Sequence, residues 1–246
     1  MKKEDCYNFI NNNSSILVIS LQCFYTDHII KNNYQINDSL TLPPFCLERQ
    51  TGNYKLDFLL IRDPYTIYYL GGYNLDDNKN NYTNFISIIK EHIVKKYKKI
   101  IIIGLSSAAY AGLLFILNSD LSNIIHEAYL CSPQIDIFTK KNTYLCHATD
   151  KQARLKLLTS LVPRKYSSFK FFNLSKKLNS YTGSCKLFIY YHKQNNIDFN
   201  NIKNIKRNIK NVTITELNDA VAKSKETHNT LAIIYKKVFD SLINKK

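Results

Sequence analysis

Residues Lys99–Asn118 read KIIIIGLSSAAYAGLLFILN, and this stretch decides the fold. The run Ile100–Ile103 is β-branched and apolar throughout, which is typical of a strand buried on both faces of a parallel sheet. Small residues follow at once, and Tyr110–Leu117 then has the apolar character of a buried helix. Because strand, tight turn and helix follow one another directly, the stretch predicts one unit of an α/β sheet.

The turn between this strand and helix has the spacing Gly-x-Ser-x-Ala, with Gly104, Ser106 and Ala108. A serine on a sharp strand-to-helix turn has its hydroxyl pushed out above the sheet edge, and the residues two before and two after it must be small. The N–H of Ser107 opens the helix and could bind an oxyanion in the same space. We therefore predict that Ser106 is a nucleophile. The alternative is an ordinary turn whose serines cap and pack the helix.

Composition narrows the classes of function. A length of 246 residues suits one domain, or one domain with an insertion, and 45% hydrophobic residues allow a sizeable core. The formal net charge is +15, but the lysines are spread along the chain without a long block. Abundant Lys, Asn, Ile and Tyr indicate a general compositional bias, so we do not expect nucleic-acid binding.

The sequence contains no targeting or membrane-spanning pattern. The N-terminus MKKEDCYNFINNNSS lacks the apolar region of a signal peptide, and no apolar run reaches the roughly 18 residues that a membrane span needs. The six cysteines form no Cys-x-x-Cys pair, which favours buried free thiols in a reducing compartment. We therefore expect a cytoplasmic protein. We predict no metal or cofactor, since no Gly-x-Gly-x-x-Gly or Walker sequence is present.

Strand-like and helix-like segments alternate along the rest of the chain. We predict strands at Ser15–Leu21, Leu56–Arg62, Ile124–Cys131, Cys185–Tyr191 and Val212–Leu217, and helices at Thr83–Lys96, Asp150–Leu161, Phe199–Ile209 and Thr227–Asn244. This alternation indicates a mostly parallel sheet with helices on both faces. The basic, aromatic segment 135–182 interrupts the pattern. We therefore predict a single α/β domain over residues 1–246 with a helical lid inserted at 135–182.

A nucleophilic serine needs a base, and the base needs a group that orients it. His228 comes after the last predicted strand and at the start of the last predicted helix, and His192, after the strand Cys185–Tyr191, is the alternative base. Asp198 follows the penultimate strand, which preserves the chain order Ser, acid, His. Asp198 also precedes a predicted helix, so a helix N-cap is the rival interpretation. The alternative acids are Glu216 and Asp219.

A second oxyanion donor is expected in the loop after an early strand. That loop begins at Gln22-Cys23, and we predict that a backbone N–H of Gln22 or Cys23 acts together with that of Ser107. The pair Gly71-Gly72 is a weaker alternative source.

These motifs resemble the α/β-hydrolase superfamily, and more closely its short bacterial members associated with surface-polysaccharide or glycoprotein pathways. The stretch 104–112 is similar to their elbow Gly-x-Ser-x-Gly-Gly-Tyr-Ala-Ala, with Ala108 and Ala109 in place of the inner glycines. Further similarities are Ser132-Pro133-Gln134 after the next strand, Asn195–Asp198 before a helix and the pair His228-Asn229.

The resemblance implies a serine esterase or acyltransferase that acts on a small or carbohydrate-linked acyl ester through an acyl-serine. Ser106 would attack the acyl carbon, His228 would carry the proton and Asp198 would orient His228. Ser132 and Gln134 would contact the substrate. Two alternatives stay open: a non-catalytic binding partner of a glycan-pathway enzyme on the same fold, and a basic nucleic-acid-binding protein.

Overall fold

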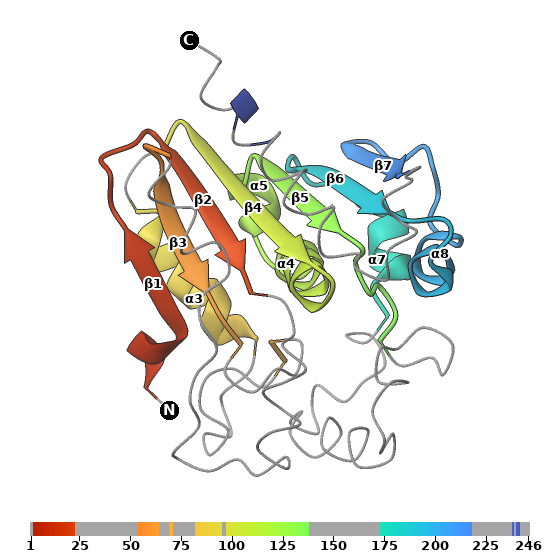
Figure 1. Cartoon of the computed structure of the whole chain (residues 1–246), viewed down its shortest axis with the longest axis horizontal. Coiled ribbons are helices and arrows are strands. Elements are labelled where there is room, and N and C mark those ends of the chain that lie inside the picture. The colour runs from red at the N-terminus through yellow and green to blue at the C-terminus, as the bar shows by residue number, and fades with distance from the viewer. Residues whose placement is uncertain are drawn as a thin grey trace.

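The computed structural model describes residues 2–22, 54–63, 69–70, 82–94, 97–137, 173–217, 238 and 240–241. These residues form a seven-stranded sheet in the order β1-β3-β2-β4-β5-β6-β7 (Figure 1). The edge strand β1 runs antiparallel to β3, and every other neighbouring pair is parallel. The strands are β1 (Tyr7–Ile10), β2 (Ile16–Leu21), β3 (Asp57–Ile61), β4 (Lys99–Leu105), β5 (Glu127–Cys131), β6 (Lys186–Tyr191) and β7 (Val212–Glu216).

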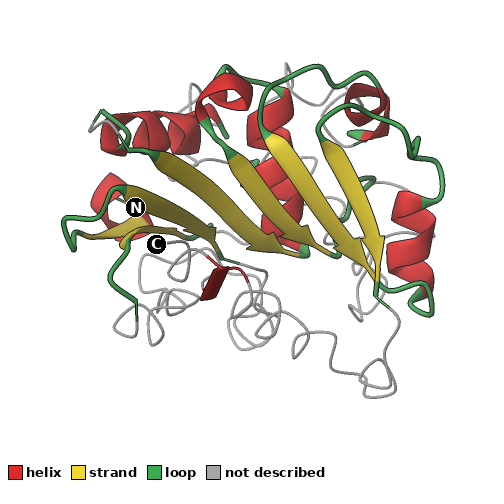
Figure 2. Ribbon diagram, turned by 90° about the horizontal axis from the view of Figure 1, so that it is seen from above, coloured by secondary structure: helices red, strands yellow, loops and turns green. Residues whose placement is uncertain are grey.

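Most of the described helices lie along one face of this sheet (Figure 2). They are α3 (Thr83–His92), α4 (Ser107–Leu117), α5 (Leu121–Ile124), α7 (Ser175–Asn179) and α8 (Asn196–Ile202), and a 3-10 helix, η1 (Lys3–Cys6), precedes β1. Side chains alternate between the two faces of each strand. Ile100 and Ile102 of β4 therefore join the larger core with the helices, whereas Ile101 and Ile103 join a smaller core on the opposite face, which includes Val238.

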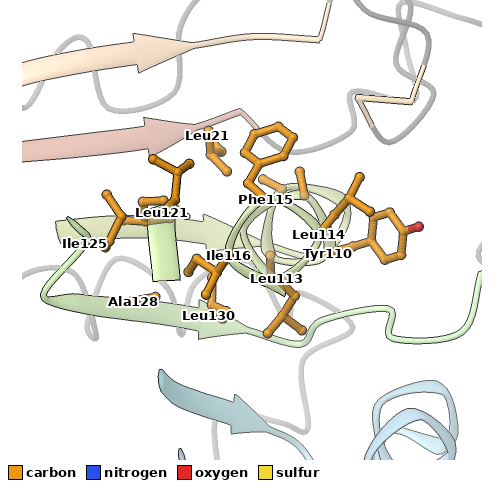
Figure 3. Packing of buried hydrophobic residues seen from close by; sticks show 14 of the residues in the cluster. Leu21, Tyr110, Leu113, Leu114, Phe115, Ile116, Leu121, Ile125, Ala128 and Leu130 are labelled. Atoms are coloured by element: carbon orange, nitrogen blue, oxygen red, sulfur yellow. The ribbon is translucent and has the colours of Figure 1, made fainter. Parts of the chain in front are cut away.

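Helix α4 is buried on all sides. Every residue from Ser107 to Ile116 is buried, as expected for a helix that is apolar around its whole circumference. Gly112 lets this helix approach the sheet, because a Cβ there would lie 2.9 Å from Cδ2 of Leu130 and 3.3 Å from Cγ2 of Ile102. Figure 3 shows the packing of this region, with Leu113, Leu114, Phe115 and Ile116 of α4 near Leu21, Leu121, Ala128 and Leu130.

The structure confirms the predicted mostly parallel α/β sheet, with some elements differing in bounds. The predicted strand Ile124–Cys131 divides into the end of α5 and β5, and the predicted helix Phe199–Ile209 is α8, which begins and ends earlier. Strand β1 has no predicted counterpart, because its four residues are only half-buried and form no apolar run. The predicted helix Asp150–Leu161 and most of Thr227–Asn244 lie outside the described residues.

The two ends of the predicted lid belong to the main core. Ile135, Ile137, Leu174 and Leu178 are each at most 1% exposed and pack in the larger core. An antiparallel bridge pairs Asp136 with Asn173 between them. These described ends of the predicted lid thus pack with the main sheet, and residues 138–172 lie outside the described residues, so the lid stays a prediction.

The described cysteines match their prediction. Cys6, Cys131 and Cys185 are buried and free, and burial raises the pKa of the Cys6 and Cys185 thiols to about 12. The other three, Cys23, Cys46 and Cys146, lie outside the described residues. Within the described ranges, no helix has the length and apolar character needed to cross a bilayer. The same residues contain no group of three or more His, Cys, Asp or Glu side chains that could hold a metal.

Candidate active site

Ser106 lies between β4 and α4 with a left-handed backbone, φ 52° and ψ −115°. A residue with a side chain adopts this conformation only at a cost, so its surroundings must hold it. The Ser106 N–H donates to the carbonyl of Cys131 at 2.9 Å, and its own carbonyl accepts from the N–H of Tyr110 at 3.0 Å. The neighbouring strand β5 and the first turn of α4 thus fix the sharp turn that carries the serine.

Gly104 allows this turn to be tight. A Cβ at position 104 would lie 2.7 Å from the backbone carbon and oxygen of Ala108, closer than real Cβ atoms approach other atoms. The backbones two residues before and two residues after Ser106 therefore meet, as the elbow prediction requires. Ala108 and Ala109, which replace glycines of the family pattern, are fully buried, and the turn forms with both of them in place.

Ser132 and Asp198 meet at the ends of the next two strands. Ser132 follows β5 with φ 48°, and its N–H donates to the carbonyl of Tyr190 at 2.7 Å. Its Oγ donates to Oδ2 of Asp198 at 2.6 Å. The backbone N–H of His192, which follows β6, donates to the same oxygen at 3.2 Å. Groups from two neighbouring strand ends thus hold one oxygen of the carboxylate.

Asp198 lies in the first turn of α8, and the structure separates its role from helix capping. Asn195 Oδ1 accepts from the N–H of Asp198 at 3.4 Å, the contact that an N-cap residue makes with the third residue of its helix. Asn195 is therefore the cap, and the 2% exposed Asp198 bonds to other elements. Burial raises the pKa of the Asp198 carboxyl, while the hydrogen bonds from Ser132 and the His192 backbone, and attraction to the His192 ring, act to lower it.

Gln134 connects this region to Ser106. Its side chain is 2% exposed, and its Nε2 donates to Oγ of Ser106 at 3.4 Å. Ser132 and Gln134 are two residues apart, so one turn contacts both Ser106 and Asp198. The structure thus brings four of the predicted site residues to the carboxyl ends of β4, β5 and β6.

The predicted oxyanion donors have different surroundings. Ser107 is the first residue of α4 and directly follows Ser106. The backbone N–H of Gln22 instead donates to the carbonyl of Ile61 at 2.8 Å, which extends the pairing of β2 with β3. The prediction for Gln22 is therefore not supported, because this N–H is already occupied in the sheet. Cys23 lies outside the described residues.

Of the candidate bases and the alternative acids, the structure describes some and leaves others outside the described residues. His228 and Asp219 lie outside the described residues. His192 is 2% exposed, and its Nδ1 has no hydrogen-bond partner among the described residues. Glu216 accepts from the hydroxyl of Tyr191 at 3.0 Å and pairs with Lys193 at 3.7 Å. These contacts place Glu216 in a separate polar cluster, whereas Asp198 bonds directly to Ser132.

Sequence reasoning missed Tyr69, which lies against the carboxyl ends of β2 and β3. Its buried hydroxyl lies 3.0 Å from the carbonyl oxygens of both Gln22 and Ile61, and its N–H donates to Oδ2 of Asp63 at 2.7 Å. Tyr69 therefore joins the ends of β2 and β3. Its φ of 63° is a property that no local pattern signals. The cap Asn195, by contrast, could have been found from an asparagine three residues before Asp198.

No protein-family model matches the sequence, and no curated protein matches it. Among solved structures, the capsule O-acetyltransferase of Neisseria meningitidis serogroup A is similar with a TM-score of 0.59 and 15% identity, over 97% of this chain and 90% of that chain. A lipase-esterase related protein from Clostridium acetobutylicum is similar with a TM-score of 0.52 and 12% identity, over 95% and 99% of the two chains.

A third similar structure is the glycosylation associate protein (Gap123) complex from Streptococcus agalactiae. Its TM-score is 0.54 and its identity 15%, over 97% of this chain and 44% of that chain. At such identities the likeness concerns the fold. Together with the parallel strands, the antiparallel edge strand and the serine elbow after β4, it leads to one conclusion: this chain has the α/β-hydrolase fold.

Proposed function

We propose that this chain is a serine acyl hydrolase or acyltransferase with Ser106 as its nucleophile. The elbow carries the proposal: a serine with φ 52° stands between a buried strand and a buried helix, and Gly104 packs against the backbone of Ala108. A protein keeps a strained residue at a sheet edge only when the surrounding structure compensates for the strain, and such residues cluster at active sites. The turn directs the Ser106 hydroxyl toward the edge where ligands of parallel sheets bind.

The reaction proceeds in two steps. The Ser106 Oγ attacks the acyl carbon while its proton passes to His228, and His228 then protonates the departing alcohol. Water, or the hydroxyl of an acceptor, next attacks the acyl-serine, gives its proton to His228 and releases Ser106. Asp198 orients the imidazole and stabilises its charged form. Ser132 and His192 both bond to Oδ2 of Asp198, so we assign Oδ1 to His228.

The oxyanion is bound by two backbone N–H groups. Ser107 supplies one from the first turn of α4, where the helix dipole adds to the attraction. Cys23 supplies the other, because the N–H of Gln22 is committed to Ile61. Gln134 contributes a side-chain N–H beside Ser106 Oγ, close enough to contact a bound acyl group.

We propose a carbohydrate-linked acyl ester as the substrate. Support comes from the names of two proteins with a similar fold, a capsule O-acetyltransferase and a glycosylation associate protein. This part of the proposal is an analogy between folds, and the site residues alone define only the acyl chemistry.

Turnover of a simple ester tests the nucleophile. p-Nitrophenyl acetate hydrolysis is measured for the wild type, for Ser106→Ala and for Ser87→Ala, which removes an exposed hydroxyl on α3 that donates to the carbonyl of Thr83. We expect Ser106→Ala to lose about 10³-fold or more in kcat/KM while Ser87→Ala retains wild-type activity. Wild-type turnover by a folded Ser106→Ala variant would exclude Ser106, and Ser107 would be the next candidate.

A further inference from the structure

Ser132 lies between the two parts of the proposed catalytic site, the serine elbow after β4 and the acid after β6. It follows β5, the strand between β4, which carries the nucleophile, and β6, which precedes the acid. Its N–H continues the pairing of β5 with β6 through the Tyr190 carbonyl, so its position is fixed by the sheet. Its hydroxyl then reaches Asp198 across a separation of 66 residues in sequence.

We propose that Ser132 is a positioning residue for the catalytic acid, whose hydroxyl holds Oδ2 of Asp198 and so leaves Oδ1 directed toward the base. The inference rests on the proposed function and revises the predicted role of Ser132 as a substrate contact. The bond of 2.6 Å is short, as expected for a hydroxyl that donates to a carboxylate. Gln134, two residues later, contacts Ser106, so the same turn sets the acid and the nucleophile relative to each other.

The local backbone supports this role. Ser132 has φ 48°, a conformation that disfavours any residue with a side chain, yet a serine occupies it. Glycine would fit the backbone better but would supply no hydroxyl. Serine at this position therefore costs backbone strain that glycine would avoid. In return, its side chain makes the hydrogen bond to Asp198.

The hydrogen bond from Ser132 also affects the pKa of Asp198, and this effect can be measured. The carboxylate of Asp198 faces the Ser132 hydroxyl and the Cys131 thiol from β5, and the backbone N–H and ring of His192 from β6. Burial raises the pKa of Asp198, and the Ser132 hydrogen bond opposes that rise by favouring the charged form. Loss of the hydroxyl therefore raises the pKa of Asp198 further. As the pH falls, the Asp198 carboxylate then becomes protonated at a higher pH than in the wild type. The loss of activity is therefore greatest at acidic pH.

The test is the pH profile of kcat/KM for p-nitrophenyl acetate, compared among the wild type, Ser132→Ala and Ser132→Gly. Both variants remove the hydroxyl, but glycine relaxes the backbone while alanine keeps its strain. We expect the acidic limb of both variants to move up by about one pH unit. At pH values below the limb, this shift lowers kcat/KM about tenfold, whereas above pH 9 kcat/KM changes little.

Two controls make the result decisive. Ser122→Ala removes a hydroxyl at the opposite edge of the sheet, where it bonds to the carbonyl of Ser119, and should leave the profile unchanged. Thermal unfolding of each variant confirms that it is folded. An active wild type whose acidic limb is the same in Ser132→Ala and Ser132→Gly would overturn the positioning role alone. A wild type without esterase activity would overturn the proposed function and this inference together.

Discussion

Two serines at the carboxyl ends of neighbouring strands both have a positive φ, and they differ in the other contacts that accompany this conformation. Ser106 after β4 has φ 52°, and Ser132 after β5 has φ 48°. Apart from the bond of its N–H to Cys131 on β5, the turn at Ser106 is held by residues close in sequence, because Gly104 packs against Ala108 and Tyr110 bonds back to Ser106. The conformation of Ser132 is accompanied by a contact with Asp198, 66 residues away.

We propose that this difference distinguishes Ser106 as a nucleophile from Ser132 as a positioning residue. A residue that reacts needs an accessible side chain on a rigid local turn, so its hydroxyl should be dispensable for folding. A residue that positions another group has its side chain already bonded in the resting protein, so its hydroxyl contributes to stability as well as to activity. The predictions below separate these two roles, from the largest expected effect to the smallest.

The base that serves Ser106 should give the largest effect. We expect His228→Ala to lower kcat/KM by about 10³-fold or more, because a catalytic triad without its base retains only oxyanion binding and substrate binding. His192→Ala should cost less, since the backbone N–H of His192, which bonds to Asp198, is retained in the variant. Steady-state hydrolysis of p-nitrophenyl acetate measures both. The reverse ranking would move the base to the end of β6.

Because the turn at Ser106 is tight, we expect the replacement of Gly104 by alanine to destabilise the protein more than the replacement of Gly112. Gly104→Ala places a Cβ 2.7 Å from backbone atoms of Ala108, which cannot move without opening the elbow. We expect a loss of about 3 kcal/mol in unfolding free energy, together with a loss of activity. Gly112→Ala meets side-chain methyl groups of Leu130 and Ile102, which can shift, and alanine regains about 1 kcal/mol of helix propensity.

Urea denaturation of the two glycine variants checks this ranking. The net cost of Gly112→Ala should be below about 1 kcal/mol, with esterase activity retained. Equal destabilisation by the two substitutions would show that the backbone contact at the elbow has no special role.

Replacing each serine with glycine should give the smallest effects, and of opposite sign. Ser106→Gly removes strain worth about 1–3 kcal/mol against a backbone-entropy cost of about 1 kcal/mol, so we expect a small gain in stability. Ser132→Gly also relaxes the backbone but loses a hydrogen bond to a buried carboxylate, so we expect a loss of about 1 kcal/mol at pH 7. Urea midpoints measure both changes. A gain of stability in both variants would mean that the Ser132–Asp198 bond contributes nothing to folding.

The contrast between local contacts at Ser106 and the distant contact of Ser132 also explains which features can be predicted from the sequence. Residues 100–117 contain the strand, the turn and the helix of the elbow, so the sharp turn at Ser106 can be predicted from one stretch. The partner of Asp198 cannot, because it depends on β5 lying between β4 and β6 and on the φ of Ser132. Gln22 was predicted as an oxyanion donor because the apolar strand ends before it. Its N–H nevertheless still pairs with β3, since hydrogen bonding can continue past the last apolar residue.

A covalent label on the nucleophile tests the central claim most directly. The wild-type protein is treated with a fluorophosphonate, digested, and its peptides are sequenced by mass spectrometry. We predict a single phosphonyl adduct on Ser106, formed with loss of fluoride, and no adduct in Ser106→Ala under the same conditions. Absence of any adduct on the folded wild-type protein, or an adduct on another serine with Ser106 unmodified, would contradict the account.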